Sequence, residues 1–413
     1  MKTLFILLVT ISLIGLSSCN SMENEPSTDR KIEIGGKSAQ LIEANNAFGL
    51  ELFKKIRQSI ESENIMVSPL SVSLALGMAY NGAGGDTKAE MEEAMKLNGL
   101  TPDQINNSYK SLVSALQSLD KDVVFEIANA IYYKNEFSVK QNFRDLNSTC
   151  YDAEIDDLDF SGPTALETIN GWVAEKTHDK IMKILDELSP DDRMVLLNAI
   201  YFYGTWTRKF DEDGTKMNRF TKNDGTIKDV PMMHKEDKLQ YTTNNLFSAI
   251  QLPYGTGQYN MVVILPAQGN TSEDIINELD AENWKNWSSG FEEKEHVVVT
   301  MPRFKFGFET SLKEVLKEMG MKKAFSDMEA DFSGISDIPL FISKAIHKTY
   351  IDLNETGTEA AAVTALVISA TSTGNEPPKI YFTADHPFVF AITEKDTDAI
   401  LFIGEVQNPE YED

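Results

Sequence analysis

The chain has 413 residues, of which 42% are hydrophobic and 25% are charged, and its formal net charge is −26. This composition is typical of a globular protein with enough apolar material for a large core. The acidic balance argues against nucleic acid and anionic membrane surfaces as direct partners. No linker rich in proline, glycine or serine interrupts the interior, so we expect one large domain.

Residues 1–18 have the pattern of a secretory signal, because Lys2 supplies a positive start and an apolar stretch follows it. The next residues, Leu-Ser-Ser-Cys19, resemble a bacterial lipobox, in which the cysteine becomes the first residue and is acylated. An uncleaved anchor and a plain signal peptide are the alternatives. The resemblance implies an exported bacterial lipoprotein of the outer membrane, which touches the membrane only through its lipid anchor. Acidic residues after Cys19 faintly resemble a signal for display on the cell surface.

Residues 19–40 are polar and are expected to form a flexible tether, so the folded domain should span residues 41–413. The chain contains two cysteines. If Cys19 is lipidated, Cys150 has no disulfide partner. The fold must then be stabilised by its core rather than by cross-links, which is reasonable for a chain of this length.

Hydrophobic periodicity predicts the first elements of the domain. Apolar residues recur every four positions from Phe48 to Ile60, which indicates an amphipathic helix. A second helix should end at Tyr80, where the glycine-rich residues 82–85 follow. These glycines end a helix and precede no Gly-Lys-Ser/Thr, which excludes a phosphate-binding loop. The continuous apolar run 194–202 predicts a strand covered on both faces.

No motif of a hydrolase or a metalloenzyme is present. The sequence lacks Gly-x-Ser-x-Gly, His-Glu-x-x-His and paired-cysteine motifs. The acidic residues 211–214 are not followed by the remaining ligands of a calcium loop. The five histidines are not spaced as metal ligands. We therefore expect no enzyme activity, no catalytic residues, no metal site and no cofactor.

Residues 355–372 are small, almost uncharged after Glu359 and free of proline. With a period of two, one face carries mainly small and apolar side chains: Thr358, Ala360, Ala362, Thr364, Leu366 and Ile368. The following residues 371–379 contain a glycine and a proline pair, which predicts an exposed loop. On composition alone, an alanine-rich helix or an ordinary strand is the favoured interpretation of the stretch.

Four segments resemble the serpin family. Residues 355–362, Glu-Thr-Gly-Thr-Glu-Ala-Ala-Ala, resemble the hinge of the reactive-centre loop in inhibitory serpins, and residues 382–392, Phe-Thr-Ala-Asp-His-Pro-Phe-Val-Phe-Ala-Ile, resemble the C-terminal signature. Residues 67–71 and 82–87 are similar to the early core. The resemblance covers roughly residues 41–409. It implies a monomer with an α+β serpin fold, three mixed β-sheets, about nine helices and an exposed reactive-centre loop.

The resemblance also implies roles for individual residues. The hinge would consist of Glu355, Gly357, Thr358, Glu359, Ala360, Ala361 and Ala362. His347 would lie under the main sheet in a shutter, with Ser68, Ser71 and Asn198 as hydrogen-bond neighbours; as a core histidine it needs such partners in any case. In the region called the breach, Glu355 would pair with Arg303 near Trp206. The family usually has lysine at position 303, and arginine can still pair.

For function, the resemblance implies a bait for a serine or cysteine protease. The protease attacks the loop and forms an acyl-enzyme, and the cleaved loop then inserts as a new strand. Counting seventeen residues from Glu355 places the scissile bond at Thr371–Ser372, with Ala370 and Ile368 as alternative attacked residues. Threonine there suggests an elastase-like protease with a small apolar pocket. The alternative is a non-inhibitory serpin that acts as a surface binding or carrier protein, although such relatives typically have bulky, charged or proline residues in the hinge.

Overall fold

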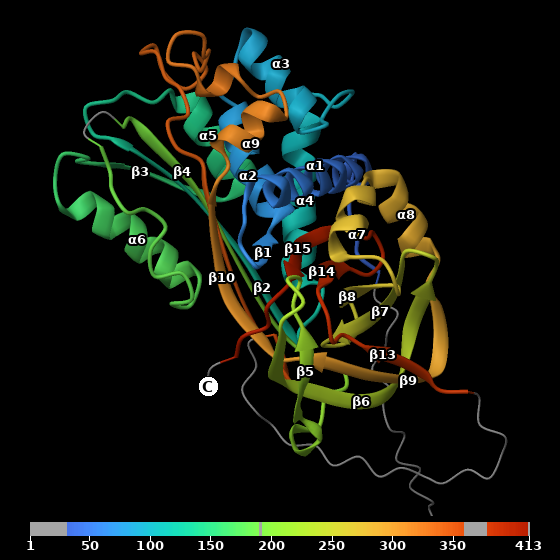
Figure 1. The fold of residues 1–413 in the computed structure, drawn as a ribbon. Coiled ribbons are helices and arrows are strands. Elements are labelled where there is room, and N and C mark those ends of the chain that lie inside the picture. Colours follow the sequence, from blue (N-terminus) through green and yellow to red (C-terminus); the bar gives the residue numbers. More distant parts are fainter. Residues whose placement is uncertain (1–30, 190–191, 359–377, 412–413) are drawn as a thin grey trace, which may run out of the picture.

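The computed structural model describes residues 31–189, 192–358 and 378–411 (Figure 1). The predicted signal peptide, the lipidation site Cys19, the hinge residues Glu359–Ala362 and the reactive bond Thr371–Ser372 lie outside the described residues. In the part of the chain that is described, no helix is both long and apolar enough to span a lipid bilayer.

The described ranges contain nine α-helices, in agreement with the expected number. In Figure 1, α6 lies apart from the other helices, against the strands β2 and β4, and α7 and α8 lie near β7 and β8. The helices are α1 (Ser38–Ser59), α2 (Pro69–Tyr80), α3 (Gly85–Ala94), α4 (Pro102–Ser118), α5 (Gln141–Tyr151), α6 (Thr164–Lys176), α7 (Ser272–Glu278), α8 (Ala281–Ser289) and α9 (Lys313–Glu318).

A six-stranded sheet has the strand order β10-β11-β12-β4-β2-β3. Its members are β2 (Val123–Lys134), β3 (Ala153–Leu158), β4 (Met194–Thr205), β10 (Phe304–Ser311), β11 (Ile346–Asn354) and β12 (Gly357–Thr358). Strand β12 has only two residues. This sheet carries the candidate functional site.

The remaining strands form a second, nine-stranded sheet with the order β1-β15-β14-β8-β7-β6-β9-β13, and β5 pairs with β6. Its members are β1 (Asn64–Val67), β5 (Lys216–Thr221), β6 (Ile227–Thr243), β7 (Phe247–Tyr254), β8 (Tyr259–Pro266), β9 (Glu292–Pro302), β13 (Ile380–Thr383), β14 (Phe388–Glu394) and β15 (Ile400–Val406).

The α+β class is confirmed, but the described strands form two hydrogen-bonded sheets rather than three. The reason is the length of β6, which has 17 residues. Strand β6 pairs with β9 along most of its length and with β7 over its last four residues. One continuous strand therefore joins two groups of strands that the family resemblance counted separately.

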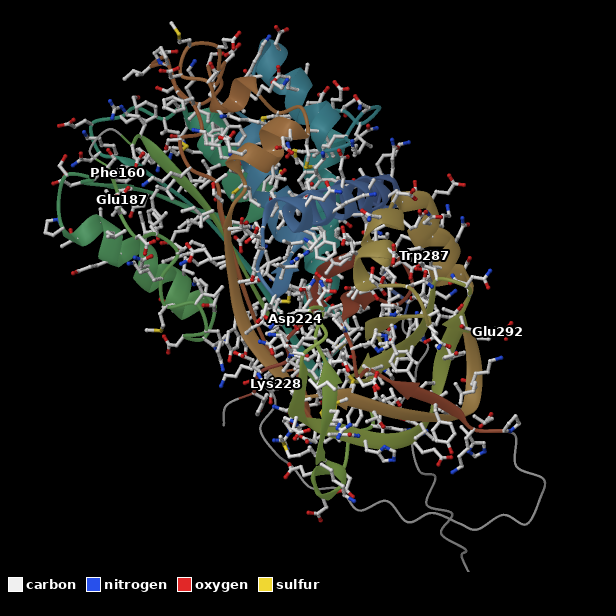
Figure 2. All side chains as sticks on the ribbon, in the orientation of Figure 1. Phe160, Glu187, Asp224, Lys228, Trp287 and Glu292 are labelled. Carbon is white, nitrogen blue, oxygen red and sulfur yellow. The ribbon has the colours of Figure 1, made fainter. Side chains whose placement is uncertain are left out.

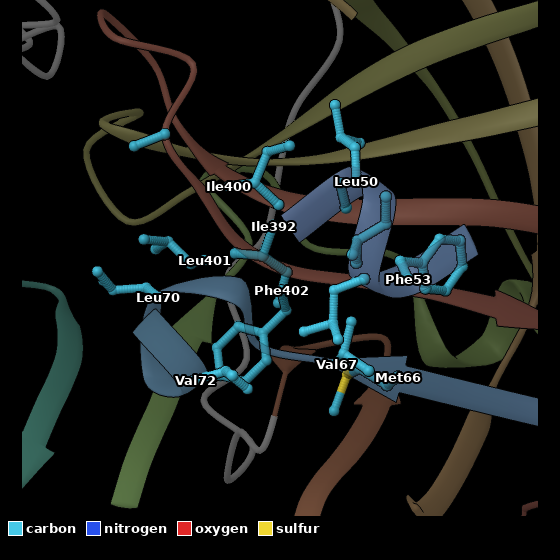
Figure 3. Packing of buried hydrophobic residues seen from close by; sticks show 14 of the residues in the cluster. Leu50, Phe53, Met66, Val67, Leu70, Val72, Ile392, Ile400, Leu401 and Phe402 are labelled. Carbon is cyan, nitrogen blue, oxygen red and sulfur yellow. The ribbon is translucent and has the colours of Figure 1, made fainter. Parts of the chain in front are cut away.

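Both faces of the six-stranded sheet are covered. Figure 3 shows the main core, where side chains of α1, β1, α2, β14 and β15 pack together. A smaller cluster lies under α6 and includes Trp172. Strand β4 contributes to both clusters: Met194, Leu196 and Ile200 pack against the main core, and Val195, Leu197 and Ala199 belong with the α6 cluster. The predicted strand covered on both faces is confirmed.

Charged side chains lie at the surface; among those labelled in Figure 2, Glu187, Asp224 and Glu292 are exposed and Lys228 is half-buried. At the N-terminal end, α1 begins at Ser38, and Ile32 is already buried against the core. The folded part of the described chain therefore begins before Leu41, and the expected tether is correspondingly shorter at its C-terminal end.

Candidate functional site

Strands β4 and β11 do not pair with each other; the two residues of β12 lie between them and pair with both. Thr358 pairs with Leu353 of β11 and with Gly204 of β4, and Gly357 pairs with the residues next to them. Beyond Thr358, no described strand lies between β4 and β11. We call this space between the two strands the slot.

Both residues of β12 are closely enclosed. Thr358 is buried, and its hydroxyl lies 2.7 Å from the hydroxyl of Tyr254. Gly357 has φ +149°, and a Cβ atom there would lie 2.1 Å from the carbonyl oxygen of Gly204. Glycine is required at this position because no side chain fits that space. Two of the predicted hinge residues thus lie at the head of the slot.

Two cavities follow one another along the slot. The first, of about 30 Å³, is lined by β4 at Ile200–Phe202, by β11 at Tyr350–Asp352 and by Thr358 itself. The second, of about 120 Å³, is lined by β4 at Met194–Asn198 and by residues 340–348, together with apolar side chains of α2. The slot therefore widens with distance from β12.

Three of the four predicted shutter residues lie together under the sheet. Nε2 of His347 accepts a hydrogen bond from the backbone N–H of Ser68 at 3.0 Å. The Ser68 hydroxyl donates to the carbonyl of Leu401 and accepts from the backbone N–H of Ser71, which caps the start of α2. Burial lowers the pKa of His347 to about 4, so the ring is neutral at pH 7.

Asn198, the fourth predicted member, belongs to a different group. Its Nδ2 donates to Oδ1 of Asn129 at 2.7 Å, and Asn129 in turn donates to the carbonyl of Tyr151. Oδ1 of Asn198 is buried and has no hydrogen-bond partner among the described residues. The expected single network of four residues is therefore divided, because Asn198 lies on β4 and His347 lies on β11 with the slot between them.

The predicted breach residues come together at the end of the slot that β12 closes. Arg303 Nε donates to Glu355 Oε1 at 2.6 Å, and the hydroxyl of Thr215 donates to the same oxygen. The Glu355 side chain is only 4% exposed. Trp206 Nε1 donates to the carbonyl of Asn354 at 2.9 Å, which connects β4 to the end of β11. Arginine thus forms the pair for which the family usually has lysine.

Sequence reasoning missed several residues beside the breach, which connect to it through Phe210: Lys235 Nζ lies 4.5 Å from the centre of the Phe210 ring, and the N–H of Phe210 donates to the carbonyl of Glu355. Lys235 Nζ donates to the carbonyl of Arg208 at 2.8 Å and lies 3.4 Å from Asp237, which also pairs with Arg208 at 2.7 Å. Burial lowers the pKa of Lys235 to about 8. In addition, the Arg303 guanidinium lies 5.4 Å from the ring centre of Tyr411. These contacts join distant parts of the chain, so no local pattern could have predicted them.

Comparison with known proteins agrees with this geometry. Residues 43–409 match the model of the family described as serpin (serine protease inhibitor). The chain belongs to the serpin family. It is 36% identical over 379 residues to an uncharacterized serpin-like protein of Methanosarcina acetivorans. The alignment covers 89% of this chain and 86% of that protein.

Solved serpin structures have the same fold. The native state of tengpin, a thermophilic serpin, aligns with a TM-score of 0.82 and 31% identity over 92% of this chain and 98% of that one. Thyroxine-binding globulin in complex with thyroxine aligns with a TM-score of 0.80 and 28% identity over 90% of this chain and 100% of that one. The family and the fold predicted from the hinge and the C-terminal signature are confirmed. Serpins are in general protease inhibitors rather than enzymes.

Proposed function

We propose that this serpin traps a serine protease, or a cysteine protease of similar specificity, by inserting its cleaved reactive-centre loop into the slot. The observation that carries the proposal is the arrangement of β12. Its two residues already pair with β11 and β4 in an antiparallel register, and an inserted loop would continue this register. The loop itself lies outside the described residues, and the slot supports the proposal.

The register matches small residues to the narrow part of the slot. Continued from Thr358, it would place Ala360 between Ile351 and Phe202, and Ala362 two positions further along. The cavity lined by these strand positions has a volume of about 30 Å³. Alanine side chains fit such a space, whereas larger side chains would have to displace the strands.

The next core-facing residue would meet the shutter. The same register would place Thr364 between His347 on β11 and Asn198 on β4. Oδ1 of Asn198 is buried there without a partner among the described residues. A threonine hydroxyl can donate a hydrogen bond to it and so remove the cost of an unsatisfied buried acceptor, about 1–3 kcal/mol.

The largest side chains of the insert would reach the wider of the two cavities. Leu366 and Ile368 follow Thr364 on the same face, opposite β4 at Met194–Asn198. That part of the slot holds the cavity of about 120 Å³. Burying each side chain contributes roughly 1.5–3 kcal/mol. With about 0.5–1.5 kcal/mol from each ladder hydrogen bond, insertion releases on the order of 10 kcal/mol, comparable to the stability of a whole domain.

The target we propose is an elastase-like serine protease with a small apolar specificity pocket. We place the attacked bond at Thr371–Ser372, with Ala370 and Ile368 as alternative positions. A trypsin-like target is disfavoured because no lysine or arginine occurs between Thr356 and Pro378. The protein acts as a monomer in this scheme, since one loop and one slot suffice.

The test is incubation of residues 20–413 with an elastase-type protease, followed by a denaturing gel and mass spectrometry of the released peptide. We expect a complex that survives SDS and a fragment that begins at Ser372. Cleavage without such a complex, across serine and cysteine proteases of this specificity, would contradict the proposal.

The second candidate is a non-inhibitory carrier, and the specific observation in its favour is the structural similarity to thyroxine-binding globulin. In a carrier, cleavage of the loop need not raise the melting temperature. We favour inhibition because the hinge residues after Glu359 are alanines, whose small side chains suit the narrow cavity.

We also propose that Cys19 is lipidated and that the acyl chains anchor the protein in a bacterial outer membrane. The lipobox-like sequence before Cys19 supports this proposal. Two or more acyl chains give stable anchoring, whereas one does not. Expression in a bacterial host with a labelled fatty acid should label the wild type and leave Cys19→Ser unlabelled.

A further inference from the structure

The chain between β4 and β5 holds the hinge just before β12 begins. The backbone N–H of Trp206 donates to the carbonyl of Thr356 at 2.9 Å. The backbone N–H of Phe210 donates to the carbonyl of Glu355 at 3.0 Å. These two carbonyls immediately precede β12. The position of residues 206–210 therefore sets where the proposed insertion begins.

This segment is tied to β6 by one side chain. Residues 207–211 belong to no helix or strand, so no ladder of hydrogen bonds fixes them. Nζ of Lys235 on β6 donates to the carbonyl of Arg208 at 2.8 Å and lies 4.5 Å from the centre of the Phe210 ring. The face of an aromatic ring attracts a cation. One ammonium group thus holds both the backbone and the ring of the segment.

The ammonium group of Lys235 is buried together with its counter-ion. The Lys235 side chain is 9% exposed, and the carboxylate of Asp237, 3.4 Å from Nζ, is on a side chain that is 5% exposed. Arg208 pairs with the same carboxylate at 2.7 Å. Replacing a buried ion pair by apolar side chains often leaves stability unchanged or raises it, so stability gives little reason for a charge here. What the ammonium supplies is a fixed position for Phe210 and, through it, for Glu355.

We propose that Lys235 is a positioning residue for loop insertion, which holds residues 206–210 so that the hinge enters the slot in register. Without it, Phe210 and the hinge carbonyl that it binds can shift, and insertion slows. Slower insertion gives the acyl-enzyme more time to hydrolyse, so more inhibitor is cleaved for each protease that is trapped. The initial attack on the loop does not depend on this register. The inference rests on the proposed inhibitory function.

The test uses residues 20–413 and an elastase-type protease with the variant Lys235→Met, which keeps the apolar stem and removes the ammonium. We expect the stoichiometry of inhibition to rise about threefold to fivefold, the effect of losing roughly one hydrogen bond. The rate constant for attack on the loop, counted as complex plus cleaved inhibitor, should stay unchanged. Lys235→Arg keeps a cation beside Phe210 and should retain most of the trapping. Lys216→Met, the same change at an exposed lysine of β5, is the matched control and should have no effect.

Hydrogen exchange read by mass spectrometry tests the position of the segment directly. Two of its N–H groups are bonded to the hinge. Exchange in residues 206–214 of the uncut chain should therefore be faster in Lys235→Met and unchanged in Lys216→Met. Ile276→Ala, at a buried position on α7, separates this role from a general loss of stability. It should lower the free energy of unfolding and leave the stoichiometry unchanged.

The outcomes separate the possible roles. An unchanged stoichiometry in Lys235→Met would overturn the inference and leave the inhibitory function intact. An equal rise in Ile276→Ala would also overturn it, because lost stability would then explain the effect. A raised stoichiometry without faster exchange would do the same, since Lys235 would then act elsewhere. If the wild type forms no SDS-stable complex, the proposed function fails and this role fails with it, and faster exchange in Lys235→Met would then show a structural contact alone.

Discussion

At the scale of single residues, Glu355 is the most constrained charge of the site. Its carboxylate is almost completely buried and depends on Arg303 and the hydroxyl of Thr215. Replacing Arg303 with methionine would leave a buried charge without its cationic partner, which costs about 3–5 kcal/mol. We expect Arg303→Met to lower the free energy of unfolding in urea by roughly 3 kcal/mol. Arg303→Lys keeps the charge and should lose only about 1 kcal/mol; equal stability of Arg303→Met and the wild type would contradict this account.

His347 makes the stability depend on pH. Its pKa is about 4 in the folded protein and has an ordinary value of 6.5 when unfolded, because burial disfavours the charged ring. Between these values the unfolded chain binds a proton that the folded chain does not. The stability contribution is therefore present above about pH 6.5 and is lost as the pH falls toward 4. The loss amounts to about 3 kcal/mol for a shift of this size.

The measurement is the free energy of unfolding between pH 4.5 and 7.5 for the wild type and for His347→Gln. Glutamine offers an acceptor to the N–H of Ser68 but does not titrate. We expect the variant to show a shallower decline on acidification. Other buried groups titrate equally in both proteins, so parallel curves would show that His347 does not carry this pH dependence.

At the scale of elements, β12 is the template on which the rest of the loop would add. Thr358 lies on the face that the core covers and is hydrogen-bonded to Tyr254. An arginine there would place a charged side chain on the buried face of the sheet, which is costly. We expect Thr358→Arg to turn the inhibitor into a substrate, with cleavage by the protease but few SDS-stable complexes.

The matched control is Glu359→Arg, because residue 359 belongs to the opposite face of the predicted strand and is charged already. This variant should keep most of the inhibition. If Thr358→Arg formed stable complexes at an unchanged stoichiometry, the assignment of Thr358 to the inserted face would be wrong.

At the scale of the whole molecule, the slot predicts that cleavage stabilises the protein. A loop that inserts between β4 and β11 completes the ladder of the six-stranded sheet and fills the cavity of about 120 Å³. We expect the melting temperature of the cleaved chain to exceed that of the uncut chain by well over 10 °C, since insertion releases on the order of 10 kcal/mol. Calorimetry before and after cleavage measures this, and an unchanged melting temperature would favour the carrier.

Prediction from the sequence succeeded where local patterns carry the information. The apolar run that became β4 indicated a strand buried on both faces, and the hinge and C-terminal segments indicated the family. The pairing of Arg303 with Glu355 followed from the resemblance and is present in the structure. The separation of Asn198 from His347 did not follow, because it depends on whether a strand lies between β4 and β11.

The sequence by itself determined the small, apolar character of the loop, which depends on residue type. It also determined the family through its short motifs, and the α+β class followed from the family. Only the tertiary structure decided that β6 joins two groups of strands, that Lys235 and Asp237 support the breach, and that the slot widens away from Thr358. These features arise from contacts between residues far apart in the chain. Their geometry depends on how the sheets and helices pack, which no local pattern contains.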